Sequence, residues 1–250
     1  MIEVRNLKKT LGANLVLDGV TFQIATGESV AIIGRSGCGK SVLLKHIIGL
    51  MQPDSGAVLI DGEDISRMTE RQLLRVRRKF GMVFQGAALF DSLTVEDNVA
   101  FALRREKKLT EAEIDKKVAA ALDVVELPGT EKKKPAELSG GMRKRVGLAR
   151  AIIYEPQIIL YDEPTTGLDP VVSDSIDQLM MRVRDQLHVT TVVVTHDMRT
   201  ARRVGQRIMM LHEKRIYASG TPEEIFSSPD PVVHRFVNGI ADPVDTSFLT

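Results

Sequence analysis

Short apolar runs rich in β-branched residues recur along the chain, and most of them precede a segment with helical periodicity. The clearest runs are 30–33, 82–84, 158–161 and 191–195. A short apolar run is typical of a strand buried on both faces, and alternation of such strands with helices is typical of a parallel sheet. We therefore expect an α/β domain with a mainly parallel sheet.

Two further segments have the pattern of antiparallel strands. Residues 15–24 alternate apolar and polar positions, and residues 58–62 end in the turn dipeptide Asp61-Gly62. These patterns predict a small antiparallel side sheet. From about residue 94 to residue 154 the apolar positions are spaced as on helices, which predicts a helical insertion between the strands.

The composition fits a globular protein whose charges are balanced. Of 250 residues, 43% are hydrophobic, and 34 basic against 33 acidic residues leave a net charge of +1. A chain of this length is stable without disulfides, and it has one cysteine, Cys38. The balanced charge argues against nucleic acid as a partner, so we interpret the basic clusters 75–79 and 143–145 as solvated helix faces. With neither a membrane-spanning apolar stretch nor a signal-peptide pattern, we expect a cytoplasmic protein.

A glycine-rich segment lies between the first predicted buried strand and a helix. It fits the pattern G-x-x-x-x-G-K-[ST] and consists of Gly34, Arg35, Ser36, Gly37, Cys38, Gly39, Lys40 and Ser41. Glycines let the backbone approach a polyphosphate closely, and the helix N-terminus faces its negative charge. We expect Lys40 to bridge the β- and γ-phosphates and the Ser41 hydroxyl to bind Mg²⁺.

Cys38 lies inside this glycine-rich segment and has two interpretations. It is either a small filler residue or, because it is near a helix N-terminus, a thiol with a lowered pKa.

Two adjacent carboxylates, Asp162 and Glu163, follow the apolar run 158–161. The carboxyl ends of parallel strands form the ligand edge of an open α/β sheet, so both side chains should lie beside the phosphate loop. Asp162 suits Mg²⁺, held directly or through water, and Glu163 suits a base that polarises the attacking water. Such a pair also occurs in solvated loops, but the phosphate loop favours the functional interpretation.

Ser139, Gly140 and Gly141 follow Leu138 and begin a helical run. A helix N-terminus attracts anions, so these residues form a second anion site in a chain that already has one.

With these segments the sequence resembles the ATP-binding-cassette (ABC) ATPases, whose signature begins Leu-Ser-Gly-Gly, and the match extends over most of the chain. Gln85 falls at the family's Q-loop glutamine, Asp169 in Gly167-Leu168-Asp169 at its D-loop, and His196 at its switch histidine. The resemblance implies a P-loop NTPase core with an antiparallel side sheet and a helical subdomain.

The same resemblance implies roles for individual residues. Glu163, His196 and Gln85 would take part in ATP hydrolysis, with Gln85 also joining Ser41 and Asp162 at Mg²⁺. Asp169 and the signature residues 139–141 would contact nucleotide in a head-to-tail homodimer, where each signature closes over ATP on the other protomer. Leu11 stands where family members often have an aromatic residue that stacks on adenine.

The chain carries a single cassette, and the interval between Lys40 and Asp162 is too short for the coiled-coil insertion of the DNA-repair types. It resembles the ATPase subunit of a transporter whose membrane subunits are separate chains. We expect one ABC ATPase domain over residues 1–240, with the helical subdomain at about 86–155, followed by a C-terminal tail at 241–250.

Segments 84–95 and 236–243 resemble the ATPases of Mla-type, Mce-associated phospholipid-transport systems. That resemblance implies ATP-driven movement of phospholipids between the inner and outer membranes, from the cytoplasmic face of the inner membrane. The implied partners are permease subunits, a membrane-anchored Mce-domain protein and a small STAS-domain protein. The alternatives are the ATPase of a polar amino-acid importer and, more distantly, a cassette ATPase outside transport.

Two apolar segments are further candidates for contact with partners. Residues 86–90 lack charge although they follow Gln85 in a predicted loop, so they either pack inside the helical subdomain or form a groove for a permease helix. Residues 232–240 have helical spacing and predict a final helix. The tail beyond it is expected to dock on the second protomer or on an accessory subunit.

Overall fold

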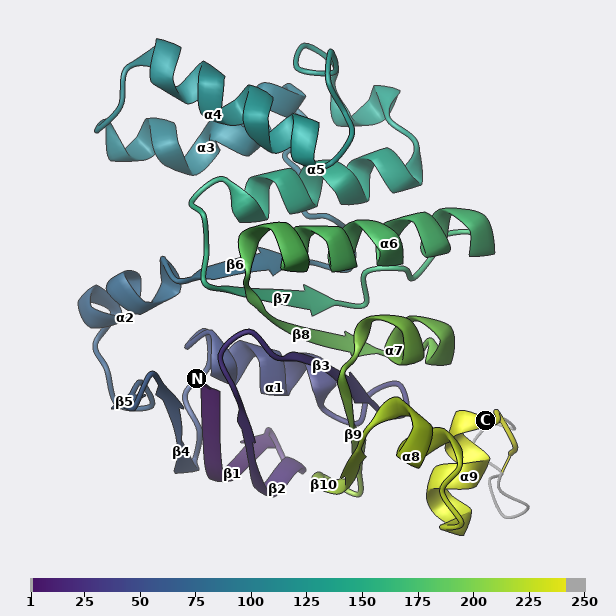
Figure 1. The fold of residues 1–250 in the computed structure, drawn as a ribbon. Helices are drawn as coiled ribbons and strands as arrows, with labels where there is room; N and C mark the ends of the chain where they lie inside the picture. The colour runs from purple at the N-terminus through teal and green to yellow at the C-terminus, as the bar shows by residue number, and fades with distance from the viewer. Residues whose placement is uncertain (1, 242–250) are drawn as a thin grey trace.

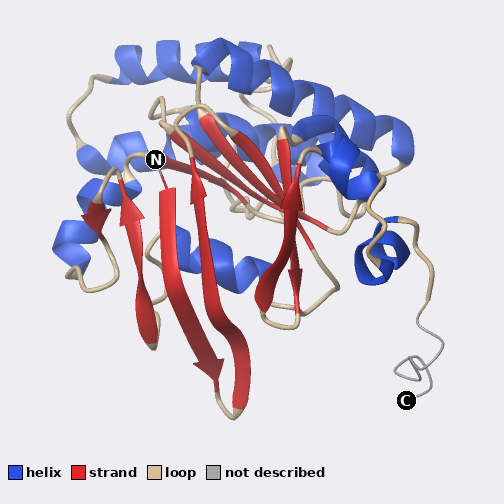
Figure 2. Cartoon of the chain, turned by 60° about the horizontal axis from the view of Figure 1, so that its bottom comes forward, coloured by secondary structure: helices blue, strands red, loops and turns tan. Residues whose placement is uncertain are grey.

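The computed structural model describes residues 2–241, which form a large sheet covered on both faces and a smaller sheet beside it (Figures 1 and 2). The large sheet has the order β10-β9-β3-β8-β7-β6. Its strands are β3 (Ser29–Ile33), β6 (Phe80–Val83), β7 (Ile158–Asp162), β8 (Thr190–Thr195), β9 (Arg207–His212) and β10 (Arg215–Gly220). All neighbours pair in parallel except β10, which is antiparallel to β9. The predicted α/β class with a mainly parallel sheet is confirmed.

The smaller sheet is antiparallel, as predicted, and has the order β2-β1-β4-β5. Its strands are β1 (Ile2–Leu11), β2 (Asn14–Ile24), β4 (Ser55–Ile60) and β5 (Glu63–Asp64). The hairpin between β4 and β5 turns on Asp61 and Gly62, whose φ values are 52° and 82°. Positive φ at both central residues is what the favoured two-residue hairpin requires.

The α-helices are α1 (Lys40–Ile47), α2 (Glu70–Arg77), α3 (Val95–Glu106), α4 (Glu111–Val124), α5 (Gly140–Ile152), α6 (Pro170–Leu187), α7 (Met198–Val204), α8 (Pro222–Phe226) and α9 (Pro231–Val237), with one 3₁₀ turn at Pro135–Glu137. Each α-helix except α1 follows a residue whose side chain accepts from an N–H group of its first turn. Thr94, Thr110 and Thr221 each form a capping box with the acidic residue three positions later. In the described part of the chain, no helix is both long and apolar enough to cross a membrane.

The last helix is shorter than its apolar spacing predicts. It ends at Val237, and Ile240 lies beyond it with 51% of its surface exposed. Gly239, with a φ of 66°, leaves the helical conformation between them and ends the apolar stripe early. The expected docking concerns the tail 241–250, of which residues 242–250 lie outside the described residues.

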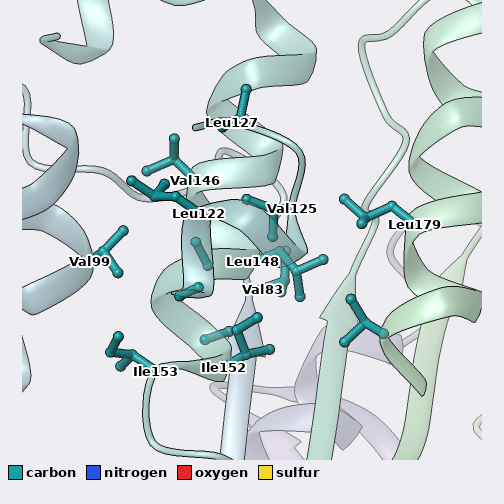
Figure 3. Close-up of a cluster of buried hydrophobic side chains, with 14 of the residues drawn as sticks. Val83, Val99, Leu122, Val125, Leu127, Val146, Leu148, Ile152, Ile153 and Leu179 are labelled. Atoms are coloured by element: carbon teal, nitrogen blue, oxygen red, sulfur yellow. The ribbon is translucent and has the colours of Figure 1, made fainter. Parts of the chain in front are cut away.

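The strands place alternate side chains on opposite faces of the large sheet, and each face has its own core. Along β7, Ile159 and Tyr161 join the core under α3–α6, whereas Ile158 and Leu160 join the core shared with α1 and the smaller sheet. Figure 3 shows the first core, in which side chains of α3, α4 and α5 meet those of the sheet. In Figure 1, α3 and α4 lie above α5 and α6, and α1 lies on the other side of the sheet. These cores fix the strand ends that carry the site.

Candidate active site

Three neighbouring strands of the large sheet lead into the predicted site residues. β3 runs into the phosphate loop 34–41, β7 ends at Asp162 next to Glu163, and β8 runs into His196. β8 pairs with β3 on one side and with β7 on the other. Because the three strands are parallel, their carboxyl ends meet at one edge, where open α/β sheets bind ligands.

The phosphate loop is closed over the side chain of Lys40, which is only 5% exposed. Its Nζ donates to the carbonyl oxygens of Gly34 at 2.7 Å and Arg35 at 3.0 Å, and lies 3.6 Å from Glu163 Oε1. Gly39 precedes α1 with a φ of 109°, and a Cβ there would lie 2.9 Å from Val16 Cγ1. The loop therefore holds a cation inside a ring of backbone at a helix N-terminus, as phosphate binding requires.

Ser41 and Asp162 are brought into direct contact, since Ser41 Oγ donates to Asp162 Oδ1 at 2.8 Å. A hydroxyl and a carboxylate are hard oxygen ligands that suit Mg²⁺. Among the described residues, no cluster of three or more acidic, histidine or cysteine side chains forms a complete metal cage. That donor set fits an ion that takes its other ligands from phosphates and water, as Mg²⁺ does in nucleotide sites.

Glu163 is held by contacts on several sides and is 9% exposed. Its N–H donates to Val194 O at 3.0 Å, and its φ is 49°, a conformation that few non-glycine residues adopt. Glu163 Oε2 accepts from Thr166 Oγ1 at 3.2 Å and from His196 N at 3.3 Å, and it lies 2.7 Å from His196 Nδ1. The carboxylate is thus fixed beside Lys40 and oriented by a histidine, which is the geometry expected of a general base.

The signature residues lie apart from the phosphate loop of their own chain. Ser139 is exposed and caps α5, with its Oγ accepting from Met142 N at 3.2 Å. The cavity beside the phosphate loop, of about 820 Å³, is lined by residues 34–36, His196 and α9, and no described signature residue is among its walls. Asp169 accepts from the N–H groups of Val171 and Val172, so its carboxylate caps α6.

Lys144 contradicts the interpretation of residues 143–145 as a solvated face, because its side chain is buried between α5 and the site. Its Nζ donates to the carbonyl oxygen of Gln85 and, at 3.4 Å, to that of Glu163. Burial lowers the pKa of this ammonium. The side chain of Gln85 itself is exposed, so Lys144 holds its backbone. The signal in the sequence is helical spacing, since Lys144 shares a face of α5 with the buried Gly141 and Leu148.

Of the two interpretations of Cys38, the structure supports the small filler residue and contradicts the thiol with a lowered pKa. Burial raises the pKa of the Cys38 thiol, and this effect outweighs the opposing charge of Lys40. A Cβ at Gly34 would lie 2.7 Å from Cys38 Sγ. The thiol therefore packs against the base of the loop, as a filler residue does.

Several known proteins are similar to this chain. The profile of the ABC transporter family matches residues 17–166. A probable ribonucleotide transport ATP-binding protein of Mycobacterium leprae is 46% identical over 95% of the chain and 69% of its own length. The chain spans about two thirds of the length of such mycobacterial relatives.

Two further curated relatives have different names. The intermembrane phospholipid transport system ATP-binding protein MlaF of Haemophilus influenzae is 39% identical over 97% of the chain and 92% of its own length. A sulfate/thiosulfate import ATP-binding protein of Chromobacterium violaceum is 42% identical over 91% of the chain and 63% of its own length.

A solved structure has the same fold. It is an ATP-binding cassette in a dimeric post-hydrolysis state with ADP and Pi bound. The TM-score is 0.81 at 35% identity, over 89% of this chain and 99% of the other.

Replacing the carboxylate of Glu163 tests its role as the base. We expect Glu163→Gln to bind ATP as the wild type does but to hydrolyse it ~10²- to 10⁴-fold more slowly, the usual contribution of a positioned base. Lys40→Ala should weaken binding itself, because the buried ammonium is lost. Nucleotide titration and phosphate release measure the two effects, with Glu213→Gln, at a side chain 84% exposed, as the control. Wild-type turnover by Glu163→Gln would place the base elsewhere.

Lys144→Met removes the donor that joins α5 to the backbone of Gln85 and Glu163 but keeps a long apolar stem. We expect turnover to fall about tenfold or more, since a hydrogen bond from a charged group contributes roughly 1.5–3 kcal/mol. ATP affinity should change little, because no phosphate contact is removed. Lys116→Met on the exposed face of α4 is the control. Steady-state kinetics showing a raised KM with an unchanged kcat would contradict this role.

Proposed function

The chain belongs to the ATP-binding-cassette (ABC) transporter family and is an ATPase, and from this premise we propose that it drives phospholipid movement between the inner and outer membranes. The observation that carries the hydrolytic part is the buried Glu163 carboxylate, fixed between Lys40 and His196 at the edge of the sheet. We assign residues 1–240 to one ABC ATPase domain, with a helical subdomain at about 86–155.

The residues that we assign to hydrolysis follow the carboxyl ends of three strands, β3, β7 and β8. Lys40 and the backbone N–H groups of the loop hold the β- and γ-phosphates, while Glu163 orients the attacking water and accepts its proton. His196, hydrogen-bonded to Glu163, keeps that carboxylate in place and faces the terminal phosphate. Ser41, Asp162 and Gln85 would hold Mg²⁺, which neutralises developing charge on the phosphates.

The signature at α5 serves the second protomer of a head-to-tail homodimer. In support of this, Ser139 is exposed at the positive N-terminal end of α5, and the described signature residues do not line the cavity beside the phosphate loop of the same chain. The similar cassette solved with ADP and Pi is a dimer. Asp169 lies in the turn that begins α6 and would contact nucleotide from there, through backbone atoms that its cap arranges.

The loop after Gln85 combines a buried anchor with an exposed apolar surface. Ala87 is buried and packs near Gly147, whereas Ala88 and Phe90 are exposed. Arg150 donates to the carbonyl oxygens of Ala87 at 2.8 Å and Ala88 at 2.7 Å, which fixes both residues in a left-handed conformation. The core interpretation therefore applies to Ala87 and to Leu89, which packs against the core under α3–α6, and docking remains our proposal for Ala88 and Phe90.

Asn98 makes this apolar surface rigid from the other end. It is fully buried, accepts from Phe90 N at 2.8 Å and donates to the carbonyl oxygens of Phe90 and Thr94 at 3.1 and 2.9 Å. The ring of Phe90 packs on Phe101 with centroids 4.7 Å apart. A permease helix seated on Ala88 and Phe90 would thus be joined through a short fixed backbone to Gln85.

The lipid assignment rests on segments 84–95 and 236–243 and on the likeness to a phospholipid-transport ATPase that spans nearly all of both chains. The complete transporter would add permease subunits, a membrane-anchored Mce-domain protein and a small STAS-domain protein at the cytoplasmic face of the inner membrane. Two other relatives carry the names of ribonucleotide and sulfate transport, so cargo is the part of the proposal that experiment must decide.

The head-to-tail arrangement is tested by Ser139→Arg. A bulky cation at the signature should block closure over the partner's nucleotide, so hydrolysis should be lost while ATP affinity of each protomer stays nearly unchanged. Phosphate release and nucleotide titration measure this, with the exposed Ser227→Arg as the control. Equal loss of affinity and turnover would contradict a shared site.

The cargo is tested in cells of the source organism that lack this protein. We expect phospholipids to accumulate in the outer leaflet of the outer membrane, which a detergent-sensitivity assay and surface lipid labelling measure. Ala88→Glu should fail to restore lipid distribution although the purified protein still binds ATP, and Ala112→Glu, at an exposed position of α4, should restore it. Unchanged lipids together with lost uptake of a polar amino acid would replace the lipid assignment by the importer.

A further inference from the structure

Three buried polar side chains form a hydrogen-bonded chain beside the site that the mechanism above does not use. Asp177 of α6, Thr200 of α7 and Thr165 of the loop after β7 are 3%, 0% and 5% exposed. Thr200 Oγ1 donates to Asp177 Oδ2 at 3.1 Å, and the hydroxyl oxygens of Thr200 and Thr165 are 3.3 Å apart. The chain joins three segments that are distant in the sequence.

Two members of this hydrogen-bonded chain, Thr165 and Thr200, lie close in the sequence to residues of the site. Thr165 is two positions after Glu163, and the following Thr166 donates directly to the Glu163 carboxylate. Thr200 lies in the first turn of α7, which begins at Met198, two residues after His196. A shift of Thr165 against Thr200 would therefore move Glu163 relative to His196, whose atoms are in contact at 2.7 Å.

Asp177 is the member of the chain whose hydrogen bonding is incomplete. Within residues 2–241, its Oδ1 is buried and has no hydrogen-bond partner. Asp177 also lines a cavity of about 690 Å³ between the loop 165–168 and α7. A buried carboxylate oxygen without a donor is unfavourable when charged, because its lost hydration is not replaced.

The surroundings favour the protonated form of Asp177. Burial, opposed by the hydrogen bond from Thr200, raises the pKa of Asp177 to about 7, and the carboxylates of Asp197 and Asp174 act in the same direction as burial. Arg203 opposes them, but it is paired with Asp174. The remaining charged or titratable groups on the cavity wall are His196, Arg199 and Arg202.

Protonation of Asp177 changes which groups can donate in this hydrogen-bonded chain of side chains. When ionised, Asp177 only accepts, so Thr200 must donate to it and Thr165 must donate to Thr200. When protonated, Asp177 supplies an O–H of its own and removes a charge from between α6 and α7. Ionisation would leave a charged Oδ1 buried without a donor, so the packing of α6 against α7 around Asp177 is less favourable when Asp177 is ionised than when it is neutral.

We propose that Asp177 is a positioning residue for ATP hydrolysis, which holds the loop of Glu163 against the segment of His196 through Thr200 and Thr165, and does so best when protonated. This inference rests on the proposed roles of Glu163 and His196. Asp177 acts through other residues, because within residues 2–241 its carboxylate is hydrogen-bonded to Thr200 and not to Glu163 or His196.

Amide hydrogen exchange of the full chain tests the proposal without relying on turnover. After correction for intrinsic exchange, protection of segments 163–169 and 195–201 in the wild type should fall about tenfold from pH 6 to pH 8. In Asp177→Asn, which keeps the shape but cannot ionise, the fall should be less than twofold. Asp185→Asn, at an exposed carboxylate on the same helix, should behave as the wild type. Identical profiles for Asp177→Asn and the wild type would overturn the proposal.

The pH dependence of kcat separates the proposed role from a purely structural one, which would not change that dependence. The ratio of kcat at pH 6.5 to kcat at pH 8.5 should be about threefold or more lower in Asp177→Asn than in the wild type, with KM for ATP unchanged. Thr200→Val should lower kcat at both pH values, and Thr200→Ser should restore it. An effect of Asp177→Asn that is the same at every pH would show a structural role alone. If Glu163→Gln retains hydrolysis, the proposed role of Glu163 fails. The hydrogen-exchange result still decides whether Asp177 holds the loop of Glu163 against the segment of His196.

Thermal unfolding gives an independent measure of the titration. Because the folded pKa lies above the usual carboxyl value of 3.8, the folded state binds more protons than the unfolded state between pH 3.8 and about 7. Stability linked to Asp177 is therefore fully present below pH 3.8 and is lost as pH rises to about 7. The Tm of Asp177→Asn should rise relative to the wild type from pH 5 to pH 8. A constant Tm difference over that range would mean that Asp177 does not titrate there.

Discussion

The buried charge of Lys40 is the constraint on which the arrangement of the site depends. An ammonium that is 5% exposed is tolerated only when oxygen atoms replace its lost water, and here two loop carbonyls and Glu163 do so. The loop must therefore curl around its own helix N-terminus, which requires glycine before α1. It also requires Glu163 to lie on a neighbouring strand end, which the sheet order supplies. A nucleotide phosphate would meet a cation already positioned and partly desolvated, rather than one that has to be ordered on binding.

The sequence carries the parts of this arrangement that are local and leaves out those that depend on contacts across the fold. The phosphate loop and the Asp162-Glu163 pair each follow a buried strand, so motif and strand prediction placed them together, as the structure shows. Lys144 and the chain from Asp177 to Thr165 were not predicted, because each joins segments that no local pattern connects. A position near a helix N-terminus did not predict the pKa of the Cys38 thiol, because burial raises that pKa.

Polar bridges, more than the apolar core, specify how the helical layer meets the site. The core under α3–α6 is continuous from the sheet to the outer helices, and apolar packing alone tolerates small sliding motions. Hydrogen bonds are directional and restrict such sliding. Two side chains of α5 form hydrogen bonds with the turn after β6: Lys144 donates to the backbone of Gln85, and Arg150 donates to the backbone of Ala87 and Ala88. The signature at the start of α5 and the turn after Gln85 are thus parts of one rigid unit. A displacement of the signature would therefore also displace the exposed surface of that turn.

The connection between the signature and this turn suggests which residues distinguish one transport system from another. Relatives named for ribonucleotide, phospholipid and sulfate transport are 46%, 39% and 42% identical to the chain, so identity in the cassette does not follow cargo. The proposed site is consistent with this, since Lys40, Asp162 and Glu163 would act on nucleotide phosphates and water whatever the cargo. A cassette of this kind has to distinguish its permease rather than its cargo. We propose that this distinction lies on surface residues that can change without disturbing the buried contacts, and Ala88 meets this condition because Arg150 holds it through its carbonyl oxygen.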